Sequence, residues 1–474
     1  MKNKLKYIVI VLVFIPCLFI FSACSRAPYV VGIERSSSST AMTDVYTITY
    51  SDGSTDSFSV TNGEDGKDLN IEDIYNVAKE KGYSGTFLEF LELYLDMDIP
   101  TDNSACINKS LMSVVSVYSE FNYESGNFLS TQKNSAVGYG SGVVYKLDKT
   151  AGDMYIITNY HVLYASVGSS CVFASDIKLS LYGNTLSFDW PTNKDGSHVL
   201  GANGYPLIEY DGDYLSCDYV GGSLLYDIAV LKVSNSSVVK NSGLIQARIG
   251  NSDDIIVGQE AIAIGNPQNL GIGATQGVVT VASEYAITTL ANGQYAQSRV
   301  IRMDTAVNGG NSGGGLFNAK GELIGIVNSK LIDEKIENIG YAIPSNIATS
   351  VADNIIKNSG SQEKKAYKAT MGITLDAQNA RAAYDENTGR VILTEDVYID
   401  SVVENSLAEQ AGIKKGDKIT AMTVKGQKYT ITRLHHVVDL GWKLEAGDVV
   451  SFTIEGKADP INIIITADCF SYVD

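Results

Sequence analysis

Short apolar runs separated by glycine-rich turns dominate the chain from Cys106 onward. They stand at residues 114–117, 177–181, 261–264, 278–281 and 323–327. Apolar residues at helical spacing are scarce in the same region. Many short strands joined by glycine-rich turns are typical of all-β barrels and sandwiches. The pattern therefore predicts a mainly β fold for this part of the chain.

A smaller α+β module precedes this region. Apolar residues alternate over residues 46–50 and again over 58–60, on either side of a turn at 51–54, which predicts a β-hairpin. Helical spacing over 71–78 predicts a helix, and a capping box at 86–89 predicts the start of a second one. No residue of this module indicates chemistry, so we expect it to act as a spacer or to dock a partner.

The first residues have the form of an export signal. A lysine-rich start is followed by an apolar run at 7–23. The run ends in Ser22-Ala23-Cys24, which resembles a bacterial lipobox and predicts a lipid on Cys24. The alternative is an uncleaved membrane anchor. Both interpretations place the remaining chain outside the cytoplasm, and the polar residues at 24–43 predict a disordered tether.

The composition is that of a globular protein of about three domains. The chain has 474 residues, of which 45% are hydrophobic and 19% are charged. Its formal net charge of −18 argues against an electrostatic surface for nucleic acid or for anionic lipid. We therefore expect no nucleic-acid partner.

Four cysteines remain beyond the predicted signal and lipidation site: Cys106, Cys171, Cys217 and Cys469. They allow three disulfide pairings in an exported protein, and reduced thiols are an equal alternative. No CxxC or Cys/His spacing indicates a metal site. We expect neither a metal nor a cofactor.

Ser312 lies among glycines in the segment 304–317, which has apolar runs on either side. A serine hydroxyl becomes a nucleophile when a base takes its proton, and the oxyanion that it creates needs backbone N–H donors. Glycines permit the sharp turn that aims the amides of Gly310 and Ser312 at one point. The alternative is a flexible Gly/Ser loop. The segment predicts a nucleophile with an adjacent oxyanion hole.

Two further stretches supply a base and an acid. His161 follows an apolar strand at 155–158, and Asp227 directly precedes an apolar strand at 228–233. Taken singly, His161 could be a hydrogen-bonded core histidine and Asp227 a turn acid. Together with Ser312 they predict a catalytic triad, in which Asp227 orients His161 and His161 activates the serine.

These stretches resemble the signatures of the HtrA/DegP family of trypsin-like serine proteases. The matching segments read TNYHV at 158–162, DIAVLK at 227–232 and GNSGGGL at 310–316, with GSGVV at 140–144 and GYAIPSN at 340–346. The resemblance implies a chymotrypsin-like double β-barrel with the triad in the cleft between the barrels. It also implies hydrolysis of unfolded or damaged proteins without a cofactor, and assembly into trimers or larger oligomers.

The chain departs from the family pattern at two prolines and in one spacing. Gly309 and Gly315 stand where the family has proline, which removes two backbone constraints and predicts a disordered oxyanion loop at rest. The spacing from His161 to Asp227 is longer than usual. The excess at 183–210 predicts a surface insertion.

The stretch Ile326-Val327-Asn328-Ser329 follows the nucleophile as the pocket-lining strand does in the family, so it predicts walls of the specificity pocket, formed by Ile326, Val327 and Asn328. No acid stands among them. A pocket without a carboxylate has nothing to pair a lysine or arginine. We expect a preference for small or medium aliphatic residues before the scissile bond.

The C-terminal segment resembles a PDZ domain. Met371-Gly372-Ile373 resembles its carboxylate-binding loop, residues 402–419 resemble a further family stretch, and Leu434 is expected to line the groove from a helix at 434–440. A peptide adding as an edge strand leaves its terminal carboxylate among loop amides. His435 and His436 are expected in the groove or on the surface.

The sequence thus predicts an exported, membrane-anchored lipoprotein of the bacterial cell envelope. Its function would be a serine endopeptidase acting on unfolded proteins or peptides, with C-terminal peptides bound at the PDZ domain and a homotrimer as its assembly. The alternative is a catalytically weak chaperone or binding scaffold with a protease fold. The predicted divisions are a signal peptide (1–23), a lipidated tether (24–43), an accessory module (44–98), a protease domain (105–358), a polar linker (359–367) and a PDZ domain (368–474).

Overall fold

The structure is a computed structural model. It describes residues 30–36, 43–50, 53–61, 71–80, 104–127, 130–167, 170–184, 186–290, 294–329, 339–386 and 390–473. The predicted signal peptide, Cys24 and the predicted second helix of the accessory module lie outside these ranges. Within them, no helix is long and apolar enough to cross a membrane. The chain divides into two units, Met1–Thr101 and Asp102–Asp474.

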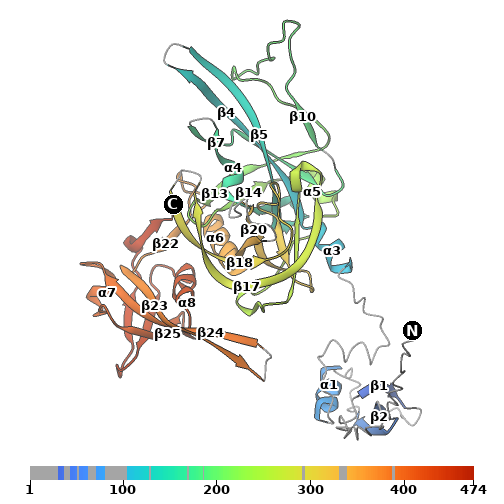
Figure 1. The fold of residues 1–474 in the computed structure, drawn as a ribbon, viewed down its shortest axis with the longest axis vertical. Helices are drawn as coiled ribbons and strands as arrows, with labels where there is room; N and C mark the ends of the chain where they lie inside the picture. Colours follow the sequence, from blue (N-terminus) through green and yellow to red (C-terminus); the bar gives the residue numbers. More distant parts are fainter. Residues whose placement is uncertain are drawn as a thin grey trace, which may run out of the picture. The chain divides into compact units, whose positions relative to one another are not determined.

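The first unit holds an antiparallel three-stranded sheet and a helix (Figure 1). Its elements are β1 (Val30–Arg35), β2 (Thr43–Tyr50), β3 (Thr55–Thr61) and α1 (Ile71–Glu80). Tyr46 pairs with Phe58 across the β2–β3 hairpin, and Tyr46 and Ile48 are buried. The predicted hairpin and the first predicted helix are confirmed.

The prediction of a disordered tether over 24–43 is wrong for residues 30–36. Strand β1 lies there and pairs antiparallel with β2, with Ile33 opposite Ile48. The polar run that follows this strand dominated the prediction. The short sequence Val30-Val31-Gly32-Ile33 is rich in β-branched residues, which favour a strand once a partner edge is present.

The second unit begins with two seven-stranded sheets (Figure 1). The first has the order β12-β9-β4-β5-β6-β14-β13, and the second has the order β15-β20-β19-β16-β17-β18-β21. An additional pairing of β20 with β21 closes the second sheet into a barrel. The strands of the first sheet are β4 (Val114–Asn127), β5 (Ser130–Asp148), β6 (Asp153–Thr158), β9 (Asp176–Leu181), β12 (Leu215–Ser216), β13 (Asp218–Ser223) and β14 (Ile228–Val233). Those of the second are β15 (Arg248–Ile249), β16 (Glu260–Gly265), β17 (Gly273–Thr289), β18 (Tyr295–Met303), β19 (Gly315–Phe317), β20 (Glu322–Val327) and β21 (Gly340–Pro344).

Short helices and one small hairpin join these strands. They are α3 (Ser104–Leu111), α4 (Tyr160–Leu163), the hairpin of β7 (Tyr164–Val167) and β8 (Ser170–Phe173), α5 (Ser237–Asn241), the 3₁₀ turns η1 (Ser252–Asp254) and η2 (Pro267–Asn269), and α6 (Ser345–Lys357).

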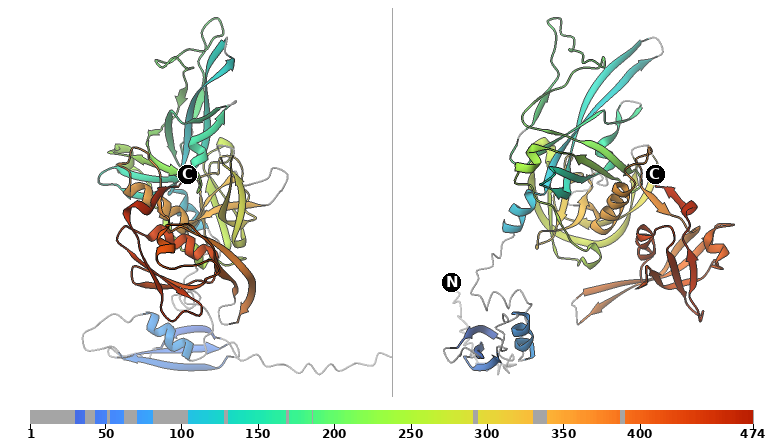
Figure 2. Two further views of the ribbon diagram at one scale, coloured as in Figure 1. Left: turned by 90° about the vertical axis from the view of Figure 1, so that its left-hand side faces the viewer. Right: turned by 180° about the vertical axis from the view of Figure 1, so that it is seen from behind.

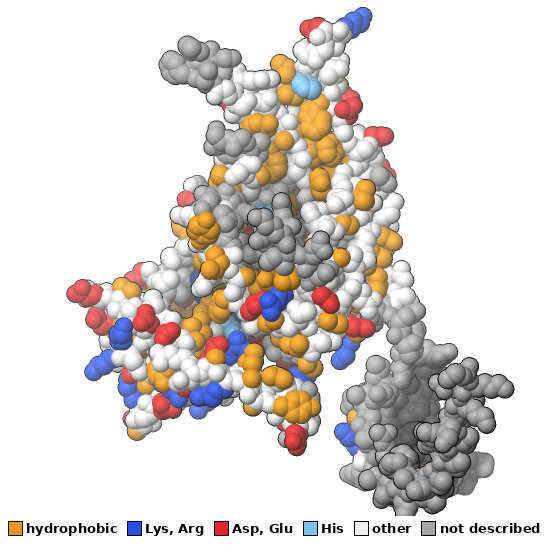
Figure 3. All heavy atoms as spheres, in the orientation of Figure 1, with side chains coloured by type: hydrophobic (Ala, Val, Ile, Leu, Met, Phe, Trp, Pro, Cys, Tyr) orange, Lys and Arg blue, Asp and Glu red, His pale blue; other side chains and the backbone are white. Residues whose placement is uncertain are grey.

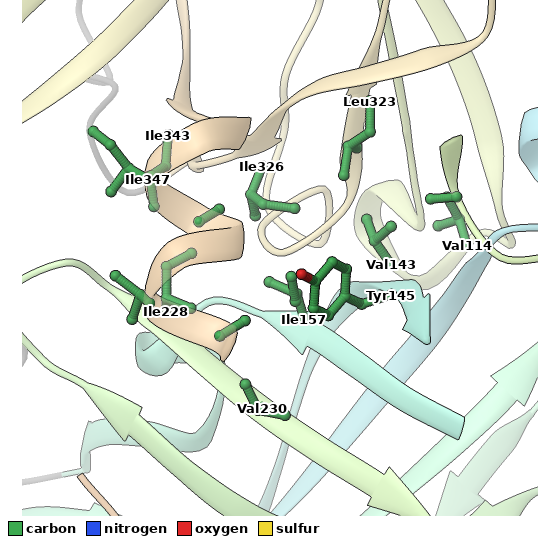
Figure 4. Packing of buried hydrophobic residues seen from close by; sticks show 14 of the residues in the cluster. Val114, Val143, Tyr145, Ile157, Ile228, Val230, Leu323, Ile326, Ile343 and Ile347 are labelled. Atoms are coloured by element: carbon green, nitrogen blue, oxygen red, sulfur yellow. The ribbon is translucent and has the colours of Figure 1, made fainter. Parts of the chain in front are cut away.

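Strand alternation divides the apolar side chains between separate cores. In β14, Ile228 and Val230 face the core between the two sheets, while Ala229 and Leu231 face the core of the first sheet. Figure 4 shows Ile347 of α6 next to Ile343 of β21, and both belong to the same shared core as Ile326 of β20. This shared core fixes the two sheets against each other. Segments of the first sheet carry His161 and Asp227, and a loop of the second sheet carries Ser312.

The insertion predicted at 183–210 lies on the surface. It contains the short hairpin of β10 (Ser187–Asp189) and β11 (Glu209–Asp211), and it runs beside the long β4–β5 hairpin in both views of Figure 2. The indole N–H of Trp190 donates to Ser135 Oγ at 3.0 Å, and this bond joins the insertion to β5. Figure 3 shows apolar side chains gathered on this face of the molecule.

The C-terminal region has its own sheet and its own apolar core. The sheet order is β23-β24-β25-β27-β28 with β26 beside β25, and β22 pairs with β29. The elements are β22 (Tyr367–Ala369), β23 (Ile373–Asp385), β24 (Arg390–Val402), α7 (Leu407–Gln410), β25 (Lys418–Val424), β26 (Gln427–Thr430), α8 (Leu434–Leu440), η4 (Gly441–Lys443), β27 (Val449–Ile454), β28 (Ile461–Ile464), η5 (Ala467–Cys469) and β29 (Phe470–Tyr472). The predicted fold class, mainly β with a chymotrypsin-like double barrel, is confirmed, and the strand-rich C-terminal region is consistent with the predicted PDZ domain.

The segment predicted as a linker at 359–367 is bound to the first sheet. The amide of Gly222 donates to Lys364 O at 3.0 Å, and the amide of Ala366 donates back to Gly222 O at 3.2 Å. Ala366 is fully buried in the shared core. The polar composition hid this contact, because backbone groups make the hydrogen bonds.

Candidate active site

The structure brings the three predicted catalytic residues together. His161 comes from α4, Asp227 from the turn before β14, and Ser312 from the loop before β19. His161 Nε2 lies 2.9 Å from Ser312 Oγ, and His161 Nδ1 lies 2.7 Å from Asp227 Oδ2. The His161 and Asp227 side chains are 17% and 14% exposed, and Ser312 is 3% exposed. The three side chains form one hydrogen-bonded chain at the edge of solvent.

Local structure holds His161 against Asp227. Strand β6 ends at Thr158, whose hydroxyl donates to Ser141 O at 2.7 Å. The following helix leaves its first amides without helical acceptors. One of them, the amide of His161, donates to Asp227 Oδ1 at 2.9 Å. The carboxylate therefore accepts from both the backbone and the ring of His161, which fixes the ring's orientation.

Asp227 has a left-handed backbone, with φ of +50°. Aspartate tolerates this region better than most residues. The amide of Tyr160 and the side-chain amide of Asn159 donate to Asp227 O at 3.2 and 2.9 Å. Ala229 pairs with Thr158 between β14 and β6, so the residues just outside this pair meet. Register thus places the acid beside the histidine.

Asn328 makes a contact with the acid that the sequence analysis missed. Its Nδ2 donates to Asp227 Oδ2 at 2.8 Å, and the residue is 3% exposed. Ile326 and Val327, predicted with it as pocket walls, are fully buried in the apolar cores. Their role in specificity stays a prediction. An amide-bearing residue at the end of an apolar strand was the available signal for the contact with Asp227.

The N–H groups of Gly310 and Ser312 are oriented because the carbonyl of the preceding residue, in the same peptide unit, is hydrogen-bonded. In a trans peptide the N–H points away from the C=O of the same unit. Gly309 O accepts from the amide of Gln268 at 2.8 Å, and Asn311 O accepts from the amide of Gly314 at 2.9 Å. Within the part of the chain that the structure describes, no protein group accepts a hydrogen bond from the amide of Gly310 or Ser312. Both donors thus remain available to a ligand.

Ser141 of β5 is fully buried and holds the loop that carries Gly310 and Ser312. Its hydroxyl donates to Gly310 O at 2.7 Å, and its amide donates to Ser312 O at 2.8 Å. The amide of Asn266 donates to Ser141 Oγ at 2.8 Å. The sequence placed Ser141 in a matching motif but gave it no role. Its contacts provide constraint where the family prolines are absent.

Steric contacts explain two of the loop's glycines. At Gly313, with φ of +84°, a Cβ would lie 2.1 Å from Ser141 O. At Gly315, a Cβ would lie 2.3 Å from a ring carbon of Phe317. Gly309 has no atom within 4 Å of such a Cβ, so space does not require glycine there. The Phe317 ring therefore accounts for one of the two replaced prolines.

The C-terminal region contacts the turn that carries the acid. The Tyr226 ring lies 5.0 Å from the Trp442 ring at 75°, and Lys368 Nζ donates to Tyr226 OH at 3.1 Å. Burial lowers the pKa of Lys368 to about 8 and raises the pKa of Tyr226 to about 12. These contacts join the C-terminal region to the residue before Asp227.

A buried ionic cluster makes a second contact between the two regions. Arg299 of β18, with a side chain 4% exposed, donates to Asp253 at 2.8 Å and forms an ion pair with Asp439 of α8. Burial raises the pKa of Asp439 to about 6 despite the arginine. His435, expected in the groove or on the surface, is 4% exposed, and burial lowers its pKa to about 2. That expectation was wrong because α8 packs against the barrel as well as its own sheet.

The predicted peptide-binding residues lie around one edge of the C-terminal sheet. Gly372 has φ of +79°, and Ile373 begins β23, which is the edge strand. Met371 is buried and Leu434 is half-buried, and both pack in the core of this region. Helix α8 packs against β23. The structure thus brings the loop, an edge strand and the helix close together.

No metal site or disulfide is found among the described residues. No group of three or more His, Cys, Asp or Glu side chains is placed to hold a metal ion. No disulfide joins any two of the four cysteines that lie in the described ranges.

Residues 140–326 match the family model described as "Trypsin-like peptidase domain". Curated relatives extend the likeness. The chain is 32% identical to "Serine protease Do-like HtrA" of Bacillus subtilis, over 62% of this chain and 56% of the relative. It is 29% identical to the protein of the same name from Lactococcus lactis subsp. lactis, over 68% of this chain and 73% of that one.

A further relative is "Periplasmic serine endoprotease DegP" of Salmonella typhimurium, which is 29% identical over 72% of this chain and 60% of its own length. The chain thus spans little more than half the length of the Bacillus relative that it matches. The resemblance to HtrA/DegP serine proteases, predicted from the motifs, is confirmed by these similarities.

Proposed function

We propose that this protein is a serine endoprotease that hydrolyses peptide bonds in unfolded or damaged proteins. The observation that carries the proposal is the hydrogen-bonded chain from Ser312 through His161 to Asp227. Nucleophile, base and orienting acid at hydrogen-bond distance are the arrangement that activates a serine. The resemblance to HtrA/DegP proteases supports the same reaction and the same class of substrate.

In the proposed first step, Ser312 Oγ attacks the scissile carbonyl carbon while His161 Nε2 takes the hydroxyl proton. Asp227 accepts from His161 Nδ1–H and stabilises the imidazolium as it forms. The amides of Gly310 and Ser312 would donate to the oxyanion. When the tetrahedral intermediate collapses, His161 returns the proton to the leaving amine, and the acyl group remains on Ser312.

Water completes the proposed cycle. His161 takes a proton from the attacking water, the second tetrahedral intermediate forms in the same oxyanion site, and its collapse releases the acid product and restores the Ser312 hydroxyl. The side chains of the triad and one water molecule supply every proton transfer in this sequence. Ile326, Val327 and Asn328 are proposed to set the preference before the scissile bond.

The C-terminal region is proposed to bind peptides with a free C-terminus. The support is the edge strand that starts at Ile373, next to the loop Met371-Gly372, with Leu434 on the neighbouring helix. A peptide would extend the sheet and leave its carboxylate at the loop amides. Calorimetry with free and amidated versions of one apolar peptide tests this role, and equal affinities would rule out carboxylate capture.

We also propose that the protein is extracytoplasmic, anchored by a lipid on Cys24, and assembled as a homotrimer. The export-like start and the lipobox resemblance support the anchor, and the periplasmic relative supports the compartment. Intact-mass analysis of the membrane-extracted protein tests the anchor, since an unmodified Cys24 contradicts it. Sedimentation of the purified protein tests the trimer, which a monomer at working concentration would contradict.

The test of the reaction is active-serine labelling with a fluorophosphonate, mapped by peptide mass spectrometry. A single adduct on Ser312, absent from the His161→Ala variant, is expected. The alternative scaffold function predicts no Ser312 adduct under conditions where trypsin is labelled. That outcome would overturn the proposed protease.

A further inference from the structure

The hydroxyl and the backbone amide of Ser329 both lie within hydrogen-bond distance of the predicted nucleophile, Ser312 Oγ. The Ser329 hydroxyl oxygen lies 2.5 Å from Ser312 Oγ, and the Ser329 backbone amide donates to Ser312 Oγ at 3.2 Å. Ser312 Oγ therefore has three hydrogen-bonding neighbours, since His161 Nε2 lies at 2.9 Å. The triad as described above needs only the contact with His161.

The number of neighbours matters because a hydroxyl has one proton and two lone pairs. In the orientation needed for catalysis, Ser312 gives its proton to His161. The amide and the hydroxyl of Ser329 then donate into the two lone pairs of Ser312 Oγ. In the other orientation, Ser312 donates to Ser329 Oγ and its proton is turned away from the base. Neither arrangement leaves a lone pair and a correctly placed proton together.

Ser329 is held in place by its neighbour. The amide of Asn328 donates to Tyr341 O at 2.9 Å, and its side chain donates to Asp227 at 2.8 Å. Asn328 is 3% exposed, whereas Ser329 is only half-buried. Ser329 thus follows a fixed residue and lies partly open to solvent, where an incoming ligand can reach it.

We propose that Ser329 is a positioning residue that caps Ser312 when no substrate is bound. The proposal rests on the proposed serine-protease function. A substrate carbonyl needs one lone pair of Ser312 Oγ, so Ser329 must withdraw from it before acylation. The cap keeps the nucleophile unreactive at rest, and the paired residues Asn328 and Ser329 bring the acid and the nucleophile under the control of one segment.

The test measures the rate at which a small fluorophosphonate labels Ser312 in the full chain. In this reaction the Ser312 Oγ–phosphorus bond forms, fluoride leaves, and the proton passes to His161. Ser329→Ala removes the capping hydroxyl and leaves the amide. A single hydrogen bond between neutral groups stabilises the resting arrangement only modestly. Labelling should therefore accelerate about two- to tenfold when the Ser329 hydroxyl is removed. Ser329→Thr retains a hydroxyl and should label at about the wild-type rate.

Ser451→Ala is the matched control. The Ser451 hydroxyl donates a bond of 2.6 Å to Asn462 in the C-terminal sheet, so its removal should leave labelling unchanged. A purely structural role for Ser329 predicts slower labelling of Ser329→Ala with a lower melting temperature. If Ser312 is still labelled, slower labelling of Ser329→Ala or labelling at the wild-type rate would overturn the proposed cap. Failure of both the wild type and Ser329→Ala to label would instead overturn the protease function on which the cap rests.

Discussion

Replacing Asn328 by alanine tests how much the triad depends on the third donor to its acid. The Asp227 carboxylate accepts from the amide of His161 at 2.9 Å, from the ring of His161 at 2.7 Å and from Asn328 Nδ2 at 2.8 Å. The Asn328→Ala variant removes the last of these three bonds. The carboxylate would keep its contacts with His161 but lose one constraint on its orientation.

The expected loss follows from the kind of bond. A hydrogen bond to a charged group contributes about 1.5–3 kcal/mol. The carboxylate acts on the imidazolium that forms during the reaction, so the loss should fall on the transition state. We expect kcat to drop about tenfold to a hundredfold while KM changes little. Asn328→Asp should be worse, because it sets a second carboxylate against Asp227.

Steady-state cleavage of a fluorogenic peptide gives kcat and KM separately. Asn318→Ala is the matched control, because Asn318 Nδ2 donates to a carboxylate of the same barrel, Glu322 Oε2, at 2.9 Å. It should lower stability and leave kcat within about twofold. If Asn328→Ala retains the wild-type kcat, or loses activity only through a higher KM, the inferred support of the acid is wrong.

Two further predictions concern the contact between the barrel and the C-terminal region. Arg299→Ala should lower the unfolding free energy by about 3–5 kcal/mol, because it leaves Asp439 buried without its partner. The control Arg248→Ala removes an exposed side chain and should cost at most about 1 kcal/mol. Equal losses for the two variants in chemical denaturation would refute this prediction. His435 has a lowered pKa in the folded protein, so below pH 6.5 the unfolded chain binds a proton that the folded chain does not. The contribution of His435 to the unfolding free energy is therefore fully present above pH 6.5. It is lost as the pH falls, by about 2 kcal/mol between pH 6.5 and 5. The His435→Gln variant should lack this component, and parallel stability curves would contradict it.

The triad and the barrel were predictable because each depends on a local pattern. His161, Asp227 and Ser312 each stand at the end or the start of an apolar strand, within a short segment of distinctive residues. Strand pairing then brings those ends together, as the register of Ala229 with Thr158 shows. The residues that meet at the site could thus be named before their geometry was known.

The contacts that hold the site were not predictable from the same patterns. Asn328 reaches Asp227 across 101 positions of sequence, and Ser141 reaches Gly310 across 169. Such contacts involve common polar residues whose types allow many other partners. The contact of Ser329 with Ser312 depends on how one backbone turn follows β20, which composition does not indicate.

The errors at the N-terminal tether and at the 359–367 linker have one physical cause. In both places a polar composition was taken to mean an unpaired backbone, but backbone groups pair independently of side-chain polarity. Val30–Arg35 adds to the edge of β2, and Lys364 and Ala366 bond to Gly222. His435 illustrates the converse, since this titratable side chain was expected in the groove or on the surface and is buried at a contact between two regions.

The most direct test of the account is the rate of casein cleavage by purified wild type, Ser312→Ala, His161→Ala and the double variant. By analogy with measured triads, Ser312→Ala should reduce turnover about 10⁶-fold, or about 8 kcal/mol of barrier. The double variant should be about as inactive as either single variant, since each removes part of one catalytic unit. Cleavage by Ser312→Ala at the wild-type rate, with contaminating protease excluded, would contradict the central claim that Ser312 is the nucleophile.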